Sequence, residues 1–243
     1  MPDLSLILPY YNQPDMLQAQ LSVIRGYPAG VRVIIVDDGS PTPAKIDKRT
    51  LRHCKAVVSL YRIIPDIPWN RGEARNLGAY LAQTDWIIQV DTDHILPVTC
   101  LDNLLSKFNP DINHWYRFPR VRIGKADTTR MKDSIPDNQS KGKIHPHQDS
   151  YLIRKDWFMD SPYDERYSGC LGGGTPFLAR MTQLHGEPLL LPDNIHLEVY
   201  TMDKVKDASV TLDRDRTEYA RRRDRIRDAR PEKMICHPCV QVF

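Results

Sequence analysis

Two carboxylates stand one residue apart at Asp91 and Asp93, directly after the apolar run that starts at Trp86. Charge at the end of a buried strand is costly unless another group neutralises it. Carboxylate oxygens are the ligands that Mg²⁺ and Mn²⁺ prefer, and such an ion can also bind the phosphates of a substrate. The spacing therefore predicts a divalent-metal site at this strand end, next to a bound diphosphate.

Two further polar clusters stand at the ends of runs of strand length, which cover residues 4–11 and 31–38. A tyrosine ring can line a base pocket. A carboxylate can accept a hydrogen bond from a nucleobase N–H or a ribose hydroxyl. Together with the carboxylates of the later strand end, these clusters predict a nucleotide site. The residues concerned are Pro9, Tyr10, Tyr11, Asn12, Asp37 and Asp38.

The elements that must position these residues are short strands that alternate with helices. We expect strands over residues 4–11, 31–38, 55–63 and 85–91, and helices over residues 13–27 and 71–83. Continuous apolar strands alternating with helices are typical of an α/β fold with a mostly parallel central sheet flanked by helices. Ligands of such sheets bind outside the carboxyl ends of the strands, where all three clusters lie.

Composition limits the class of protein. The 243 residues suffice for one large α/β domain, and 34 Lys and Arg against 31 Asp and Glu leave a net charge of only +3. No apolar run approaches the roughly 18 residues needed to span a bilayer. The amino terminus has no basic region typical of a signal peptide. Five cysteines, an odd number, do not indicate a secreted disulfide framework. We therefore expect a soluble cytoplasmic protein.

The order and spacing of the motifs resemble the family 2 glycosyltransferases, which have the GT-A fold. The opening strand LSLILPYYNQ, the strand end VIIVDDGS and the run NRGEARNLGAYLAQTDWIIQVDTD carry the resemblance, which is strong over residues 3–98. It implies a GT-A (Rossmann-like) sheet with a small acceptor-side subregion. It also implies an enzyme that moves a sugar from a nucleotide-diphosphate sugar, a UDP-sugar, to a hydroxyl acceptor with the help of Mn²⁺ or Mg²⁺.

The resemblance also implies roles for single side chains. Asp38, together with Asp37, would hold the nucleoside. Asp91 would approach the sugar or ribose, and Asp93 would ligate the metal. One residue separates Gly72 from the ARN motif where the family commonly has about three, which leaves open which arginine meets a phosphate. The other residues of the donor side would be Asn70, Arg71, Arg75, Asn76 and Thr92.

The second half of the chain resembles the family more loosely, over residues 150–169 and 177–198. Family members place a Glu-Asp pair between these pieces, and its carboxylate is the general base; here Gly174 and Thr175 stand there. A neighbouring carboxylate can replace the base, the reaction can retain the anomeric configuration without one, or the protein binds a donor with little transfer. The candidate replacements are Asp149, Asp160, Asp164 and Glu165.

Roles for the histidines follow from the same resemblance and from the geometry of a strand. His196 is expected to complete the metal shell, because the family keeps a histidine there. His94 is expected to be structural, since alternation along a strand points it away from Asp93. His145 and His147 end the polar segment 124–148 and could bind a metal. We favour a flexible, solvated loop that could be a lid or recognise the acceptor.

The chain divides into a donor-binding half (1–98), an acceptor-side half (99–212) and a basic C-terminal helix and tail (213–243). The favoured reading of the tail is a solvated helix with ion pairs. Its arginines could instead meet nucleic acid or an anionic membrane surface. The sequence leaves the acceptor open among a glycan, a small molecule, a protein and modified nucleic acid. Cys236 and Cys239 form a single pair, from which no zinc site is predicted. The alternative functions are a nucleotidyltransferase and a donor-binding protein that has lost catalysis.

Overall fold

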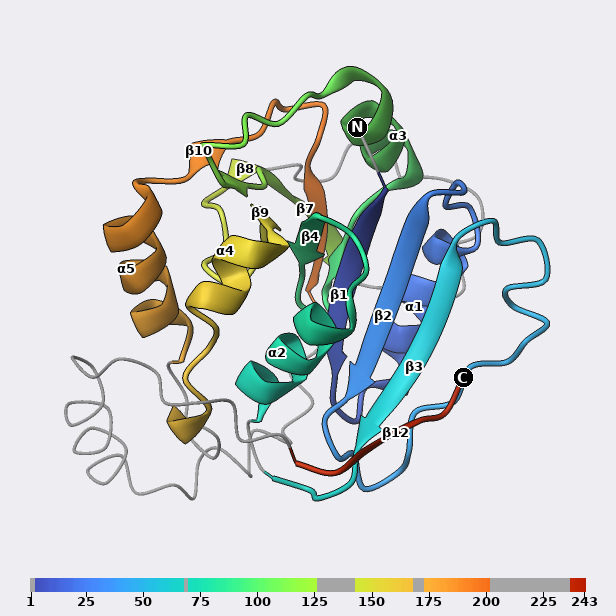
Figure 1. Ribbon diagram of the computed structural model, residues 1–243. Coiled ribbons are helices and arrows are strands. Elements are labelled where there is room, and N and C mark those ends of the chain that lie inside the picture. Colours follow the sequence, from blue (N-terminus) through green and yellow to red (C-terminus); the bar gives the residue numbers. More distant parts are fainter. Residues whose placement is uncertain (1–2, 68–69, 126–142, 168–172, 202–236) are drawn as a thin grey trace.

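The computed structural model of the chain describes residues 3–67, 70–125, 143–167, 173–201 and 237–243. Its largest element is a sheet of eight strands in the order β10-β6-β9-β4-β1-β2-β3-β12 (Figure 1). The central strands β4, β1, β2 and β3 run parallel. The strands β9 and β12 join this group antiparallel, on β4 and β3 respectively. The bounds are β1 (Leu4–Tyr10), β2 (Val31–Asp37), β3 (Val57–Ile63), β4 (Trp86–Gln89), β6 (Tyr116–Arg117), β9 (Tyr151–Arg154), β10 (Leu189–Leu190) and β12 (Cys239–Gln241).

A second sheet of four strands has the order β5-β11-β7-β8. Four residues separate the end of β4 from the start of β5, so the carboxylate pair Asp91 and Asp93 lies in the connection between the two sheets. This position keeps both carboxylates at the carboxyl edge of the parallel strands. The bounds are β5 (His94–Ile95), β7 (Arg120–Lys125), β8 (Lys143–Ile144) and β11 (Leu197–Thr201).

Different helices cover the two faces of the main sheet. Side chains alternate along β1, so that Leu6 and Leu8 pack in the core with α1 and α3. Ile7 packs on the other face, in the core with α2, α4 and α5. In Figure 1, α2, α4 and α5 lie in front of the sheet and α1 lies behind β2. The helices are α1 (Pro14–Ile24), α2 (Arg71–Leu81), α3 (Val98–Lys107), α4 (Lys155–Asp160) and α5 (Gly174–His185), with a 3₁₀ turn at Glu165–Tyr167.

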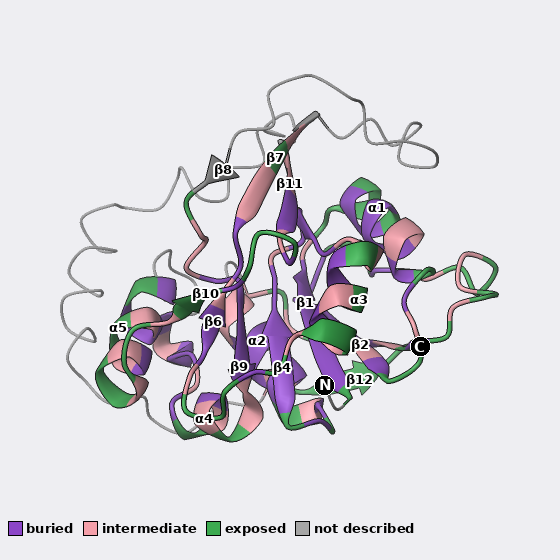
Figure 2. Cartoon of the chain, turned by 90° about the horizontal axis from the view of Figure 1, so that it is seen from above, coloured by how far each residue is buried: buried purple, intermediate pink, exposed green. Residues whose placement is uncertain are grey.

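The central strands are buried on both faces. All residues of β1 and β4 are buried, and Figure 2 shows these strands in purple between helices whose outer faces are green. Burial on both faces explains why these segments read as continuous apolar runs in the sequence, without polar alternation. None of the helices in the described part of the chain has the length and apolar character needed to cross a lipid bilayer.

The predicted α/β class, central parallel strands and helices over residues 13–27 and 71–83 are confirmed, with each element a few residues shorter than expected. The sheet is more mixed than predicted, because β9 and β12 pair antiparallel. Beyond the predicted basic helix, Cys239–Gln241 form the edge strand β12, which the sequence did not indicate. The arginine-rich residues 213–235 and Cys236 lie outside the described residues, as do residues 126–142 of the predicted loop.

Candidate functional site

The carboxyl ends of β1, β2 and β4 meet at one edge of the sheet. The parallel register sets Tyr10 beside Asp37, and the backbone N–H of Asp38 donates to the carbonyl of Tyr10 over 2.8 Å. The hydroxyl of Thr92 donates to the carbonyl of Pro9 over 2.7 Å. The three polar clusters identified in the sequence therefore lie side by side, and Thr92 joins two of them through its own side chain.

Both carboxylate oxygens of Asp37 bind groups of the protein. Oδ1 accepts the N–H of Ser40 over 2.9 Å. Oδ2 accepts the N–H of Ala44 over 2.8 Å and a guanidinium N–H of Arg62 over 2.9 Å. Asp37 therefore fixes the loop after β2, and it could bind a nucleoside only in competition with these donors.

Asp38 has a different environment. Its Oδ1 is buried and makes no hydrogen bond within the described part of the chain. Burial, followed by the negative charge of Glu73, raises the pKa of Asp38 to about 8, although a hydrogen bond from Asn70 opposes this. Asn70 also donates to Glu73. Of the two neighbouring acids, Asp38 is thus the one whose oxygen is left for a ligand that donates a hydrogen bond.

The residues that follow β1 border the loop that carries Asp38. Tyr10 is only 3 % exposed and belongs to the core. The hydroxyl of Tyr11 donates to Asp66 over 3.1 Å. Asn12 is exposed, with φ at 45°, and its N–H donates to Ser40 Oγ over 2.9 Å. Of the two tyrosines, Tyr11 therefore has the more accessible ring.

Asp91 contacts a guanidinium and an imidazole from two other elements. Arg75 of α2 donates to Asp91 Oδ1, and His147 Nδ1 lies 3.2 Å from Oδ2. Burial alone would raise the pKa of Asp91, but the charges of Arg75 and His147 lower it to about 2. Arg75 is completely buried and also reaches Gln89 Oε1 over 3.3 Å. Asp91 is therefore ionised, and α2 and the segment before β9 fix its orientation.

Asp93, the second carboxylate of the pair, is partly exposed and makes no ion pair within the described residues. Burial and then the charge of Asp91 raise its pKa to about 6. Two adjacent carboxylates without a shared cation repel one another. A bound cation would remove this repulsion.

The ring of His94 is buried beside Asp91. Its Nδ1 lies 2.7 Å from Ser150 Oγ, and its Nε2 lies 3.2 Å from the guanidinium of Arg120. Because an arginine can only donate, Nε2 accepts and Nδ1 carries the proton. Burial lowers the pKa of His94 to about 4, so the ring is neutral. These bonds give His94 a structural role, so its ring could bind a metal only in place of one of them.

Asp91, His94 and His147 each offer a ligand atom within 4.8 Å of the others, a grouping identified by a search over the described residues. Our interpretation of His147 as part of a solvated loop is wrong. β9 pairs antiparallel with β4, with Tyr151 opposite Gln89, so the residues just before β9 pass those that follow β4. One carboxylate and two imidazoles fit Mn²⁺ better than Mg²⁺, which prefers oxygen ligands throughout.

The prediction that His196 shares a metal with Asp93 is wrong. β11 pairs antiparallel with β5, which sets Tyr200 beside Asp93, and the N–H of Tyr200 donates to the Asp93 carbonyl over 3.2 Å. His196 precedes Tyr200 by four positions, or roughly 13 Å along a strand. Its Nδ1 lies 2.9 Å from the Asp193 carbonyl and 3.6 Å from Cys100 Sγ.

The four candidate replacements for the missing base differ in position. Asp164 forms a bidentate ion pair with Arg166. Glu165 accepts from Asn76 over 2.8 Å, and Asp160 is exposed at the end of α4. Asp149 is completely buried, and its Oδ1 accepts the hydroxyl of Tyr163 over 2.8 Å.

Two residues of α2 expected on the donor side contact the acceptor-side half instead. Arg71 lies 3.3 Å from Asp149 Oδ2. The amide of Asn76 donates to the carbonyl of Tyr163 over 2.9 Å and accepts the N–H of the same residue over 2.9 Å. Asn76 therefore holds the residues around Tyr163 against α2, and Arg71 links the two halves by charge.

Sequence reasoning missed four side chains of this region. Glu73 lies on α2, which was predicted, and Arg120 begins β7, which was not. The side chains that each of them contacts come from distant segments of the chain, so the local sequence does not indicate these contacts. Tyr163 stacks its ring on Phe177 at 4.3 Å between centroids. The N–H of His237 donates to Glu73 Oε1 over 2.8 Å. No local pattern around residue 237 could have indicated this contact.

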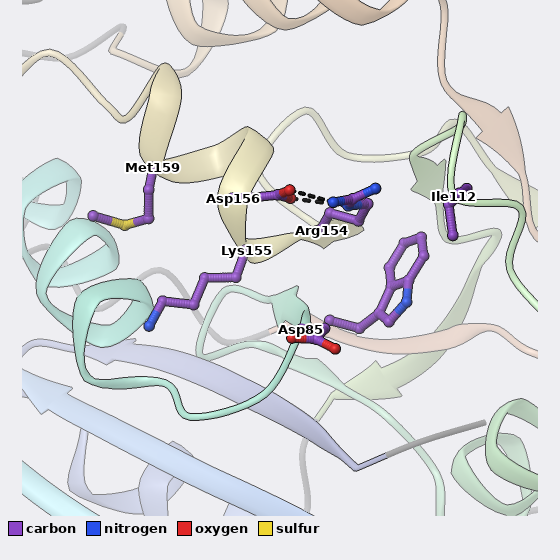
Figure 3. A pocket seen from close by; sticks show the side chains of 7 residues that line it. Asp85, Ile112, Arg154, Lys155, Asp156 and Met159 are labelled. Carbon is purple, nitrogen blue, oxygen red and sulfur yellow. Dashed lines mark hydrogen bonds and ion pairs between the residues drawn. The ribbon is translucent and has the colours of Figure 1, made fainter.

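A separate hollow lies at the opposite end of β4, before its first residue. Figure 3 shows Arg154 paired with the nearby Asp156, and Lys155 directed toward α2, where its Nζ donates to the carbonyl of Tyr80 over 3.2 Å. The hollow lies away from the carboxyl edge of the sheet and is therefore not part of the site. The lining residues are Asp85, Trp86, Ile112, Arg154, Lys155, Asp156 and Met159.

Comparison with known families identifies the class of protein to which the chain belongs. The family described as Glycosyl transferase family 2 matches residues 5–166, which include every strand end described above. The chain therefore belongs to glycosyl transferase family 2, a family of glycosyltransferase enzymes, and the resemblance read from the motifs is confirmed.

Solved structures with the same fold are GT-A glycosyltransferases. Residues 1–349 of TarS from S. aureus give a TM-score of 0.56 at 16 % identity, over 82 % of this chain and 60 % of that one. The same part of TarS in complex with UDP gives 0.57 at 15 % identity, over 90 % and 69 %. The mannosyltransferase PcManGT from Pyrobaculum calidifontis, in complex with GDP-Man and Mn²⁺, gives 0.55 at 13 % identity, over 96 % and 68 %.

Curated relatives match a shorter stretch. The pre-mycofactocin glycosyltransferases of two Mycobacterium tuberculosis strains, CDC 1551 and H37Rv, are 31 % identical over 108 residues, which is 44 % of this chain. The chain spans 21 % of the length of these relatives.

Proposed function

We propose that the chain is a metal-dependent glycosyltransferase that takes a sugar from a UDP-sugar and passes it to a hydroxyl acceptor. The observation that carries the proposal is the meeting of an unpaired buried oxygen, on Asp38, with a carboxylate and imidazole group around Asp91 at one edge of a parallel sheet. A nucleoside and a diphosphate need these two kinds of group side by side.

The nucleoside end is formed by Asp38, Tyr11 and Asn70. Asp38 Oδ1 accepts a nucleobase N–H or a ribose hydroxyl, which supplies the hydrogen bond that the described part of the chain does not. Tyr11 offers its ring to the base. The UDP complex of TarS and the GDP-Man complex of PcManGT support a nucleotide donor.

The diphosphate end is formed by the residues after β4. Asp91, His147 and His94 would hold the ion, with Asp93 as an additional carboxylate, and Mn²⁺ is the ion that this donor set favours. The ion supplies positive charge where the leaving diphosphate gains negative charge. Arg71, at the start of α2, lies close enough to the same region to bind a phosphate oxygen as well.

The acceptor binds on the side formed by residues 99–212, against the donor half formed by residues 1–98. The acceptor's identity is tested with hydroxyl compounds of three kinds: glycans, small molecules and modified nucleic acid. Nucleic acid would bind through Arg221, Arg222, Arg223 and Arg225, which lie outside the described residues. Its affinity would fall by about one power of salt for each phosphate neutralised.

Thermal unfolding with UDP and Mn²⁺ tests the donor site. Ligand at about 100 times its Kd adds roughly 2.7 kcal/mol to the free energy of unfolding, so Tm should rise with UDP and Mn²⁺ together and less with either alone. Asp93→Ala and His147→Ala should lose the Mn²⁺-dependent part of the rise. Asp160→Ala, which removes an exposed acid on α4, is the matched control and should keep it.

Product analysis then separates the three possible activities. Incubation with a panel of UDP-sugars and Mn²⁺ should release UDP and free or transferred sugar. Release of pyrophosphate from a nucleoside triphosphate and a sugar phosphate would indicate a nucleotidyltransferase. Donor binding without release of UDP under any condition would indicate a binding protein and contradict the proposal.

A further inference from the structure

Gly174 stands where family members carry an acid, and another carboxylate lies beside it in the fold. It is the first residue of α5. A Cβ atom on Gly174 would lie 2.3 Å from Oδ1 and 3.0 Å from Oδ2 of Asp149. The Asp149 carboxylate therefore fills the space that a side chain at position 174 would need.

The surroundings of Asp149 leave one of its oxygens without a hydrogen bond in the described part of the chain. Tyr163 donates to Oδ1 over 2.8 Å, which fixes the carboxylate. Oδ2 is buried and accepts no hydrogen bond within the described chain, although Arg71 Nη2 lies 3.3 Å away and balances its charge. A buried carboxylate oxygen without a donor is uncommon and needs an explanation.

The other acids of this region are already engaged or lie elsewhere. Both oxygens of Asp164 bind Arg166, and Glu165 binds Asn76. Asp160 faces solvent at the end of α4. Only Asp149, of the four, lies against the backbone of Gly174.

We propose that acid and glycine have exchanged places in this chain, and that Asp149 is the catalytic base of an inverting transfer. The proposal rests on the proposed glycosyltransferase activity. The acceptor oxygen forms a bond to the anomeric carbon while the bond from that carbon to the diphosphate breaks, and its electron pair leaves with the nucleoside diphosphate. The acceptor proton moves to Oδ2 of Asp149, which afterwards releases it to water.

Arg71 links this step to donor binding. Its side chain is 29 % exposed, and its Nη2 lies 3.3 Å from the buried Oδ2 of Asp149. A bound diphosphate competes for the guanidinium, because phosphate oxygens accept charge-assisted hydrogen bonds from arginine. Donor binding thereby draws Arg71 away and exposes Oδ2 to the acceptor.

The experiment uses the full chain with Mn²⁺ and the UDP-sugar that the parent hydrolyses fastest, with water as the acceptor. Asp149→Asn keeps the size of the side chain and an oxygen for Tyr163 but removes the base. It should slow UDP release about 10²-fold or more, the usual scale for general base catalysis, while the Tm rise with UDP and Mn²⁺ is unchanged. Asp160→Asn is the matched control and should keep the parental rate.

The exchange itself is tested by a double substitution. Gly174→Asp alone should be poorly active, since its side chain meets Asp149. Asp149→Gly should lose activity as Asp149→Asn does. The variant with both Asp149→Gly and Gly174→Asp returns a carboxylate to the same space and should recover at least tenfold over Asp149→Gly, a non-additive result that a purely structural role would not produce.

Three outcomes would overturn the inference. These are an Asp149→Asn rate within about threefold of the parent, a sugar released with the donor's anomeric configuration, and a folded, donor-binding double variant no faster than Asp149→Gly. A parent that binds UDP and Mn²⁺ but never releases UDP would contradict the proposed function itself, which separates the two failures.

Discussion

His237 and Glu73 are joined by two contacts across 164 positions of the chain. The imidazole Nδ1 lies 2.6 Å from Glu73 Oε2, and the backbone N–H donates to Oε1 over 2.8 Å. Glu73 is only 3 % exposed and adjoins Asp38 and Asn70. The end of the chain, which pairs with β3 as β12, therefore supports the proposed nucleoside end of the site (Figure 1).

Replacing this imidazole should cost stability. His237→Ala keeps the backbone N–H but removes the ring from a buried carboxylate, which we expect to lower the free energy of unfolding by about 1–3 kcal/mol. Urea unfolding followed by circular dichroism measures the loss. Gln241→Ala, an exposed position of the same strand, is the control. Equal losses in the two variants would mean that the strand, and not the contact with Glu73, is what matters.

The raised pKa of Asp38 predicts a pH dependence of stability. The folded carboxyl keeps its proton up to about pH 8, whereas the unfolded one loses it near pH 4. The folded state thus binds more protons between these values, so the free energy of unfolding falls as pH rises, by up to about 1.4 kcal/mol per pH unit. The contribution is complete below pH 4 and lost above pH 8.

Asp38→Asn removes this titration. The stability of the variant relative to the parent should increase from pH 5 to pH 8 and then stay level. Urea unfolding at one-unit steps from pH 5 to pH 9 gives the difference directly. A difference that does not change with pH would show that the folded protein holds Asp38 ionised throughout.

Arg75 and Asp91 form a buried ion pair in the site, with the Arg75 side chain fully buried and that of Asp91 20 % exposed. Arg75→Met removes the cation and leaves the carboxylate with His147 alone, which should cost about 3–5 kcal/mol. Arg75→Lys should also destabilise, because an ammonium cannot replace the planar fork that reaches both Asp91 and Gln89. Arg49→Met, which breaks an exposed pair with Asp47, should leave the unfolding midpoint unchanged. Similar losses at residues 75 and 49 would contradict this.

The strand ends of the donor half could be predicted from the sequence because the signal is local. Strands buried on both faces read as continuous apolar runs, and parallel strands bring their carboxyl ends to one edge. Asp38 and Asp91 were placed correctly at that edge for this reason.

The remaining parts of the site depend on pairing between distant segments. The antiparallel register of β9 on β4 carries His147 and Asp149 past Asp91, and the register of β11 on β5 carries His196 away from Asp93. A shift by one residue would reverse the side-chain directions in either pair, and the flanking sequences show no feature that fixes the register. The same holds for β12 and His237.

Gly39 offers a test of the loop that carries Asp38, because its matched control lies in the same chain. Gly39 and Gly186 both have positive φ, at 69° and 77°. A Cβ on Gly39 would lie 2.3 Å from the Pro65 carbonyl oxygen, whereas a Cβ on Gly186 would have nothing within 4 Å. Both alanine variants incur the strain of positive φ, about 1–2 kcal/mol. Only Gly39→Ala must also move the backbone before α2, so it should lose clearly more stability and weaken the Tm rise with UDP and Mn²⁺. Equal losses of stability in the two variants, with the UDP response kept in both, would show that the loop can rearrange at little cost. Its contact with residues 65–66 would then not shape the donor site.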